Sequence, residues 1–146
     1  MKIPKILIVS LLFACIGITT EVIFTAFSNL VISIADNTPL NWSLTGKTYV
    51  WMFFIYALIP FLFKLFKPFF DGKSFFFKVF LGIFVIYLVE FLSGLLLKLL
   101  LGACPWEYTT GLHVLGVIRL DYFPAWAVFA ALVIYVNELL EHRISE

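Results

Sequence analysis

Charged residues are scarce in this chain of 146 residues. They make up 13% of it, whereas hydrophobic residues make up 63% and aromatic residues 19%. A soluble domain of this size cannot bury that much apolar side chain, so the composition excludes an ordinary globular protein. The formal net charge of +1 gives no indication of a nucleic-acid partner. We therefore expect a polytopic membrane protein without a separate soluble domain.

Cysteine is also rare, and nucleotide-binding and metal-binding motifs are lacking. Cys15 falls in an apolar span and Cys104 in a loop, so the two should not form a disulfide. The segment 41–48 ends like a phosphate-binding loop but begins with asparagine instead of glycine. The cysteine, histidine and acidic residues of the loop 102–121 lack a compact metal-ligand spacing. The sequence predicts neither a cofactor nor a metal site.

Four apolar stretches are long enough to cross a bilayer. A hydrocarbon core about 30 Å thick needs roughly 20 helical residues, and such stretches lie at about 6–30, 49–66, 75–101 and 122–140. Asparagine, aspartate, proline and glycine mark the exits from these stretches. The prediction is an all-α fold with a single transmembrane domain over residues 1–146. It is a polytopic membrane bundle of four transmembrane helices with a long outer loop folded over the helix ends.

Lysine and arginine near the ends of the spans indicate the orientation. With four spans, both termini and the middle loop share one side of the membrane. That side carries Lys2, Lys5, Lys64, Lys67, Lys73, Lys78 and Arg143, against Lys47, Lys98 and Arg119 on the other. By the positive-inside rule we expect an integral membrane protein with both termini in the cytoplasm, in the cell membrane if the source is bacterial.

Two glutamates, Glu21 and Glu90, lie deep inside the first and third spans. A carboxylate in hydrocarbon costs several kcal/mol and is a functional-site hypothesis by default. Each lies about 15 residues into its span, roughly 22 Å along a helix. Each shares a helical stripe with small and hydroxyl residues, which lets a neighbouring helix approach. We therefore expect the carboxyls to converge at one height, in two halves that resemble weak parallel repeats.

Two interpretations of these glutamates stay open at this point. In one, they are struts that bond to Arg119, Lys98 or hydroxyl groups and fix helix packing. In the other, they line a cavity that binds a cationic or hydroxylated group, or relay a proton.

The loop 102–121 is long and apolar for a connection between helices. Exposure of such a loop to water is unfavourable, so it should dip back into the membrane or lie over the helix ends. We expect Arg119 to matter more than His113, because a guanidinium near two carboxyls lowers their cost and can hold a phosphate or carboxylate.

Several runs of residues resemble the transmembrane protein 229 family, which is grouped with bacterial proteins named type IV ABC-transporter permeases. The runs are GITTEVIFTAF at 17–27, GKTYVWMFFIY at 46–56, EFLSG at 90–94, ACPWEY at 103–108 and GVIRLDYFPAW at 116–126. The resemblance implies a multi-pass membrane protein with a glutamate in each of two helices. Glu107 replaces the aspartate usual in the family, Asp121 matches an acidic position, and His113 and Arg119 fall outside its fixed polar positions.

These patterns predict a small permease-like or lipid- or solute-binding protein with an intramembrane carboxylate site. The candidate ligand-binding residues are Glu21, Glu90, Trp106, Glu107, Tyr108, Arg119 and Asp121. An intramembrane enzyme acting on a lipid head group and a membrane scaffold or assembly factor are the alternatives. The bilayer is the expected partner. Because four short helices enclose little volume, we also expect a homo-oligomer or a partner membrane subunit.

Overall fold

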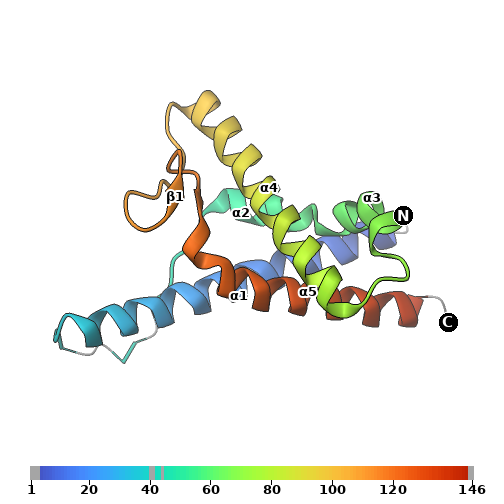
Figure 1. Ribbon diagram of the computed structural model, residues 1–146, viewed down its shortest axis with the longest axis horizontal. Helices are drawn as coiled ribbons and strands as arrows, with labels where there is room; N and C mark the ends of the chain where they lie inside the picture. The colour runs from blue at the N-terminus through green and yellow to red at the C-terminus, as the bar shows by residue number, and fades with distance from the viewer. Residues whose placement is uncertain (1–3, 40–41, 44, 145–146) are drawn as a thin grey trace. The chain divides into compact units, whose positions relative to one another are not determined.

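The computed structural model describes residues 4–39, 42–43 and 45–144, without the side chains of 142–144. Lys2 of the orientation prediction, and Asn41 of the segment that resembles a phosphate-binding loop, lie outside the described residues. The elements are α1 (Lys5–Ala35), α2 (Val50–Ala57), α3 (Ile59–Phe70), α4 (Phe75–Leu101), β1 (His113–Val114), β2 (Ile118–Arg119), the 3-10 helix η1 (Leu120–Tyr122) and α5 (Phe123–Ile144), as Figure 1 shows.

Four helical stretches in the described part of the chain are long and apolar enough to cross a membrane. They are Lys5–Ala35, Val50–Phe70, Phe75–Leu101 and Leu120–Glu141. The predicted all-α fold with four such helices is confirmed, and it supports an integral, multi-pass membrane protein. The first helix continues to Ala35 instead of ending near residue 30, because the apolar run continues without glycine or proline. It ends before Asn37, whose φ of 52° is incompatible with a helix.

The second span is interrupted, which the sequence prediction did not include. Helices α2 and α3 are separated at Leu58, whose N–H donates to the carbonyl of Ile55, three residues earlier. Pro60 has no N–H and therefore cannot bond to the carbonyl of Tyr56. The break follows from this missing donor.

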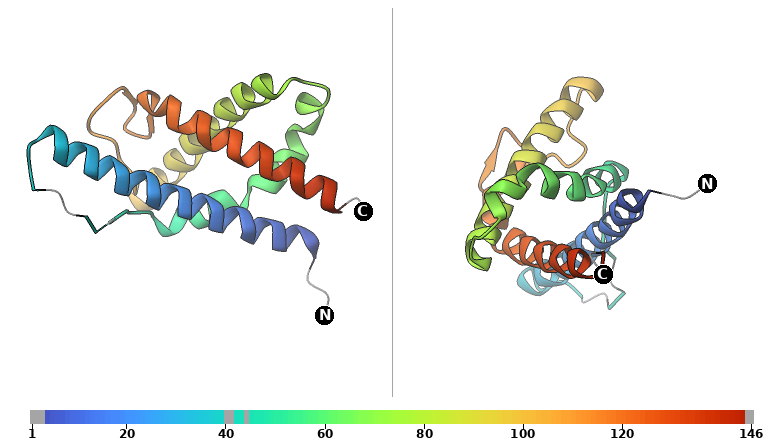
Figure 2. Two further views of the ribbon diagram at one scale, coloured as in Figure 1. Left: turned by 90° about the horizontal axis from the view of Figure 1, so that it is seen from below. Right: turned by 90° about the vertical axis from the view of Figure 1, so that its right-hand side faces the viewer.

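The chain divides into two compact units, Met1–Leu62 and Phe63–Glu146. In the first unit α1 packs along α2, and in the second α4 packs along α5. Figure 2 shows the chain after α1 returning beside that helix. Two contacts hold it there: Asn29 Nδ2 donates to the carbonyl of Thr45 at 3.1 Å, and the Lys47 N–H donates to Thr25 Oγ1 at 2.8 Å.

The loop between α4 and α5 contains a short β-hairpin that the sequence prediction missed. Strands β1 and β2 pair antiparallel, with His113 opposite Arg119 and Val114 opposite Ile118. The turn between them is formed by Leu115 and Gly116, with φ of 52° and 71°. The register leaves three residues, 115–117, between the paired strands, and the N–H of Val117 donates to the carbonyl of Val114 at 3.0 Å. Positive φ at the two central positions of this turn suits the twist of a hairpin. The loop folds back along the C-terminal half of α4, where Trp106 and Val117 are buried, whereas Leu112 and Leu115 are exposed.

Candidate functional site

Glu90 lies in the middle of α4 with only 6% of its surface exposed. Its Oε1 accepts a hydrogen bond of 2.9 Å from the hydroxyl of Tyr108, which belongs to the loop after α4. The two residues are 18 positions apart, so the loop must return to the depth of Glu90 to make this contact. Glu90 lies 11 residues before the end of α4 at Leu101, which corresponds to about 16 Å along the helix axis.

Gly94, one turn after Glu90, lets the loop approach this closely. A Cβ atom at this position would lie 2.2 Å from Val117 Cγ1 and 3.4 Å from both Cys104 Sγ and Trp106 Cζ2. Val117 is fully buried, and Trp106 Nε1 donates to its carbonyl at 3.1 Å. Three loop residues therefore pack against the backbone of α4 at Gly94, which has no side chain. Burial there raises the pKa of the Cys104 thiol, which stays protonated at neutral pH.

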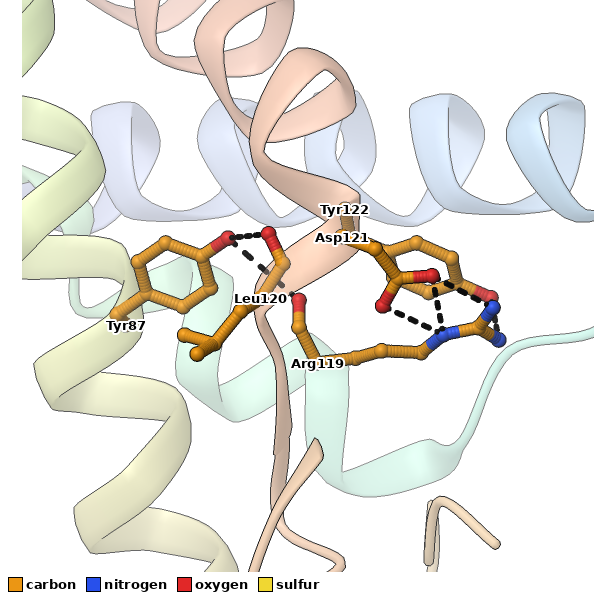
Figure 3. Close-up of polar contacts among 5 residues, drawn as sticks. All are labelled: Tyr87, Arg119, Leu120, Asp121 and Tyr122. Atoms are coloured by element: carbon orange, nitrogen blue, oxygen red, sulfur yellow. Dashed lines mark hydrogen bonds and ion pairs between the residues drawn. The ribbon is translucent and has the colours of Figure 1, made fainter. Parts of the chain in front are cut away.

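Two further hydrogen bonds order the loop, one within it and one to α4. The N–H of Tyr108 donates to the carbonyl of Gly116 at 2.8 Å, so the hairpin turn holds the backbone that carries the tyrosine. The hydroxyl of Tyr87, one turn before Glu90, donates to the carbonyl of Leu120 at 3.0 Å, as Figure 3 shows. The loop is thus attached to α4 before Glu90 by Tyr87 and after it by the packing at Gly94.

Arg119 is bound on all three of its nitrogen atoms. Its Nε and Nη2 donate to the carboxylate of Asp121 at 2.8 to 3.1 Å, and its Nη1 donates to the hydroxyl of Tyr122 at 3.0 Å (Figure 3). The guanidinium also lies 4.4 Å from the centre of the Tyr122 ring. The hydrogen bond to Asp121 raises the pKa of Arg119, which stays charged. The hydrogen bonds described for Arg119 therefore satisfy Asp121 and Tyr122, not the glutamates.

Two aromatic rings connect the hydrogen-bonded pair Glu90–Tyr108 to the group formed by Arg119, Asp121 and Tyr122. The rings of Tyr108 and Tyr122 meet edge to face, with centroids 5.8 Å apart. Glu90, Tyr108, Tyr122, Arg119 and Asp121 therefore form one contiguous group of residues, called here the Glu90 cluster. Glu90 is buried, the two tyrosines are half-buried and Asp121 is exposed, so the cluster leads from the interior of the second unit to its surface.

Trp106 and Glu107 have different roles from those of the cluster. Trp106 is buried against Gly94 and supports the loop. Glu107 is exposed and accepts a hydrogen bond of 2.9 Å from Lys98 Nζ near the end of α4. Of the candidate residues, the structure thus joins Glu90, Tyr108, Arg119 and Asp121 in one cluster and places Trp106 and Glu107 at its edge.

Glu21 belongs to the first unit and has its own partners. Its Oε2 accepts hydrogen bonds from Thr48 Oγ1 at 2.8 Å and from the hydroxyl of Tyr56 at 3.2 Å. A Cβ at Gly17, one turn before Glu21, would lie 2.2 to 2.6 Å from the Tyr56 ring. Both glutamates therefore lie one turn from a glycine that an aromatic ring contacts, and both accept a tyrosine hydroxyl. The convergence of Glu21 with Glu90 stays a prediction from the sequence.

Thr48 and Tyr56 are site residues that the sequence interpretation missed. Each lies in or beside an apolar helix, where a hydroxyl group needs a polar partner. This requirement could have indicated from the sequence that the two hydroxyl groups bind a buried polar residue. Hydroxyl groups were among the partners expected for the glutamates, but nothing in the spacing selected these two.

No protein-family model matches this chain, and no solved structure matches it. The resemblance to the transmembrane protein 229 family therefore stays a prediction from the sequence runs.

Proposed function

We propose that this chain is a small permease-like membrane protein that binds a lipid or solute at an intramembrane carboxylate site centred on Glu90. The observation that carries the proposal is the contact between Glu90, buried in a helix that can span a membrane, and Tyr108 from the returning loop. An ionisable residue at such depth usually lines a substrate or ion path. A cationic or hydroxylated ligand group would complement the carboxyl.

The gradient of exposure along the Glu90 cluster supports a binding role. Exposure rises along the cluster from the buried Glu90 through the half-buried Tyr108 and Tyr122 to the exposed Asp121, so polar groups connect the carboxyl to the surface of the second unit. Tyr122 and Tyr108 have apolar rings with polar ends, which suit a ligand with both properties.

The alternatives receive less support. An enzyme that acts on a phosphorylated head group needs a cation available for the phosphate, but the nitrogens of Arg119 donate to Asp121 and Tyr122. A scaffold function would be supported if substitutions in the Glu90 cluster left ligand binding unchanged. As an ABC-transporter component the chain would need an ATPase from another chain.

We propose that it acts as a homo-oligomer or with a partner membrane subunit, with both termini in the cytoplasm.

Native mass spectrometry of the protein extracted from its expressing membrane in mild detergent tests this function. We expect the unmodified chain to retain a lipid or small solute, and Glu90→Gln to lower the retained fraction by about ten-fold, as the loss of one charge-assisted hydrogen bond predicts. Asp36→Asn is the matched control, because it removes an exposed carboxylate at the end of α1. Equal retention by the two variants, or a chain that retains nothing, would contradict the proposal.

A further inference from the structure

A cavity of about 50 Å³ lies in the second unit, at the end where α4 begins and α5 ends. This is the opposite end of α4 from the loop that carries Tyr108. Its walls include two aromatic rings, Phe63 and Phe70, and charged side chains of both signs. The volume exceeds that needed for one water molecule. A cavity with these walls can hold a small polar group beside apolar chains.

One ion pair forms the inner part of this cavity. Lys78 Nζ, in the first turn of α4, lies 2.6 Å from Glu138 Oε1 on α5. The Lys78 side chain is 23% exposed and that of Glu138 is 42% exposed, so the pair is partly protected from solvent. A short, protected pair of this kind is a fixed feature of the cavity.

The outer part of the cavity is looser. Lys67 Nζ lies 3.7 Å from Asp71 and 3.9 Å from Glu141, both too long for a direct hydrogen bond. These side chains are between 55% and 64% exposed. Exposed ion pairs of this length contribute little to stability. A ligand phosphate can therefore replace these long contacts of Lys67 with a shorter one at small cost.

The charges select the class of ligand. Lys67 and Lys78 face the carboxylates of Asp71, Glu138 and Glu141, which leaves the lining with a formal charge of −1. The negative charge of the lining disfavours an anionic head group. A zwitterionic head group can place its phosphate near a lysine and its cation near the carboxylates. A primary ammonium donates three hydrogen bonds, and carboxylate oxygens accept them. A quaternary ammonium donates none.

The cavity also lies where a lipid head group would be. Lys67 is near the end of one candidate span, Lys78 near the start of the next, and Glu141 at the end of the last. Charged residues at span ends lie at the level of the head groups. Phe63 and Phe70 are suited to contact the glycerol and upper acyl region. We propose that this cavity is a binding site for the head group of phosphatidylethanolamine, separate from the Glu90 cluster.

Competition between lipids in native mass spectrometry tests this site. The protein is delipidated in detergent and mixed with equal amounts of phosphatidylethanolamine, phosphatidylcholine and phosphatidylglycerol with identical acyl chains. We expect phosphatidylethanolamine to be retained about five-fold over each of the others, and Glu141→Gln to abolish that preference. Lys67→Gln should instead lower the retention of all three lipids, because each of them carries the phosphate. Both variants change exposed side chains, so the fold should be preserved.

Lys64→Gln and Asp36→Asn are the matched controls. Lys64 is exposed on α3 one turn before Lys67 but does not line the cavity, and we expect it to leave the lipid preference unchanged. Retention of the three lipids in their mixing ratio would overturn the proposal, as would a preference for phosphatidylglycerol or an unchanged preference in Glu141→Gln. Displacement of the lipid by soluble glycerophosphoethanolamine at equal concentration would also overturn it, because the ligand would then be a free solute.

Discussion

Substitution of Gly94 by alanine is expected to detach the loop 102–119 from α4. The new methyl group would lie 2.2 Å from Val117 Cγ1, and Val117 is fully buried and bound through its carbonyl to Trp106. Overpacking of this kind costs about 1–3 kcal/mol, and we expect a loss near the upper end because the loop also holds Tyr108. The free energy of unfolding in mixed micelles measures the loss, and faster tryptic cleavage after Arg119 reports release of the loop.

A compensating change separates this effect from a general defect of α4. Val117→Ala removes the atom that the new methyl group would contact, so the double variant Gly94→Ala with Val117→Ala should recover part of the lost stability. Gly82→Ala is the control on the same helix, since its Cβ would lie 3.2 Å from the Cβ of Ala130. If Gly94→Ala and Gly82→Ala destabilise equally, and Val117→Ala restores nothing, the docking described for the loop is wrong.

Substitution of Gly46 by alanine should have an effect as large in the first unit. Its Cβ would lie 1.9 Å from the carbonyl oxygen of Val22 and 2.7 Å from the carbonyl carbon, and both are backbone atoms of α1 that cannot rotate away. The segment 45–48 must therefore move away from α1, which breaks the hydrogen bond from Thr48 to Glu21. We expect a loss of about 3 kcal/mol in the free energy of unfolding.

Thr25→Val provides the comparison for this prediction. It removes the hydroxyl that contacts the N–H and carbonyl of Lys47, but it introduces no clash. We expect it to cost about 1 kcal/mol, as for a typical hydrogen bond. If Gly46→Ala lowers the free energy of unfolding no more than Thr25→Val does, the segment 45–48 does not lie against α1 as closely as described.

The sequence was sufficient to place the spans and the main polar residues. Hydrophobic length defines a membrane helix directly, and a glutamate such as Glu90 stands out because hydrocarbon tolerates few charges. The apolar content of the loop 102–121 predicted a return towards the helices, and Trp106 and Val117 do pack against α4, whereas Leu112 and Leu115 stay exposed. These predictions rest on the cost of transferring groups between water and lipid, which composition alone determines.

Other features depended on local geometry that the pattern does not encode. The hairpin turn at Leu115 lacks the asparagine-glycine signature usual for its backbone conformation, and its apolar neighbours do not alternate with polar residues. Pro60 was a visible signal for the break in the second span, because proline removes a helix donor. The partner of Arg119 was not predictable, because Asp121 and the glutamates are all suitable carboxylates.

The partners of Glu21 show the same limit in the first unit. Thr48 and Tyr56 are 27 and 35 residues away from Glu21 in sequence, and their contact requires the chain after α1 to return beside that helix. A periodic pattern can show which face of a helix is polar, but it cannot select a partner on another segment. Both glutamates have a tyrosine donor and a glycine one turn away, but Gly17 precedes Glu21 and Gly94 follows Glu90, so the similarity of the two halves stays a prediction from the sequence.

The coupling between Glu90 and Tyr108 is the measurement closest to the centre of the proposed site. A double-mutant cycle of Glu90→Met and Tyr108→Phe in reconstituted membranes isolates their interaction from the effects of the single changes. The hydrogen bond of 2.9 Å predicts a coupling free energy of about 1 kcal/mol or more, near the upper part of the range for polar contacts in membrane proteins. Strictly additive effects of the two substitutions would contradict the contact, and with it a binding site formed by α4 and the returning loop.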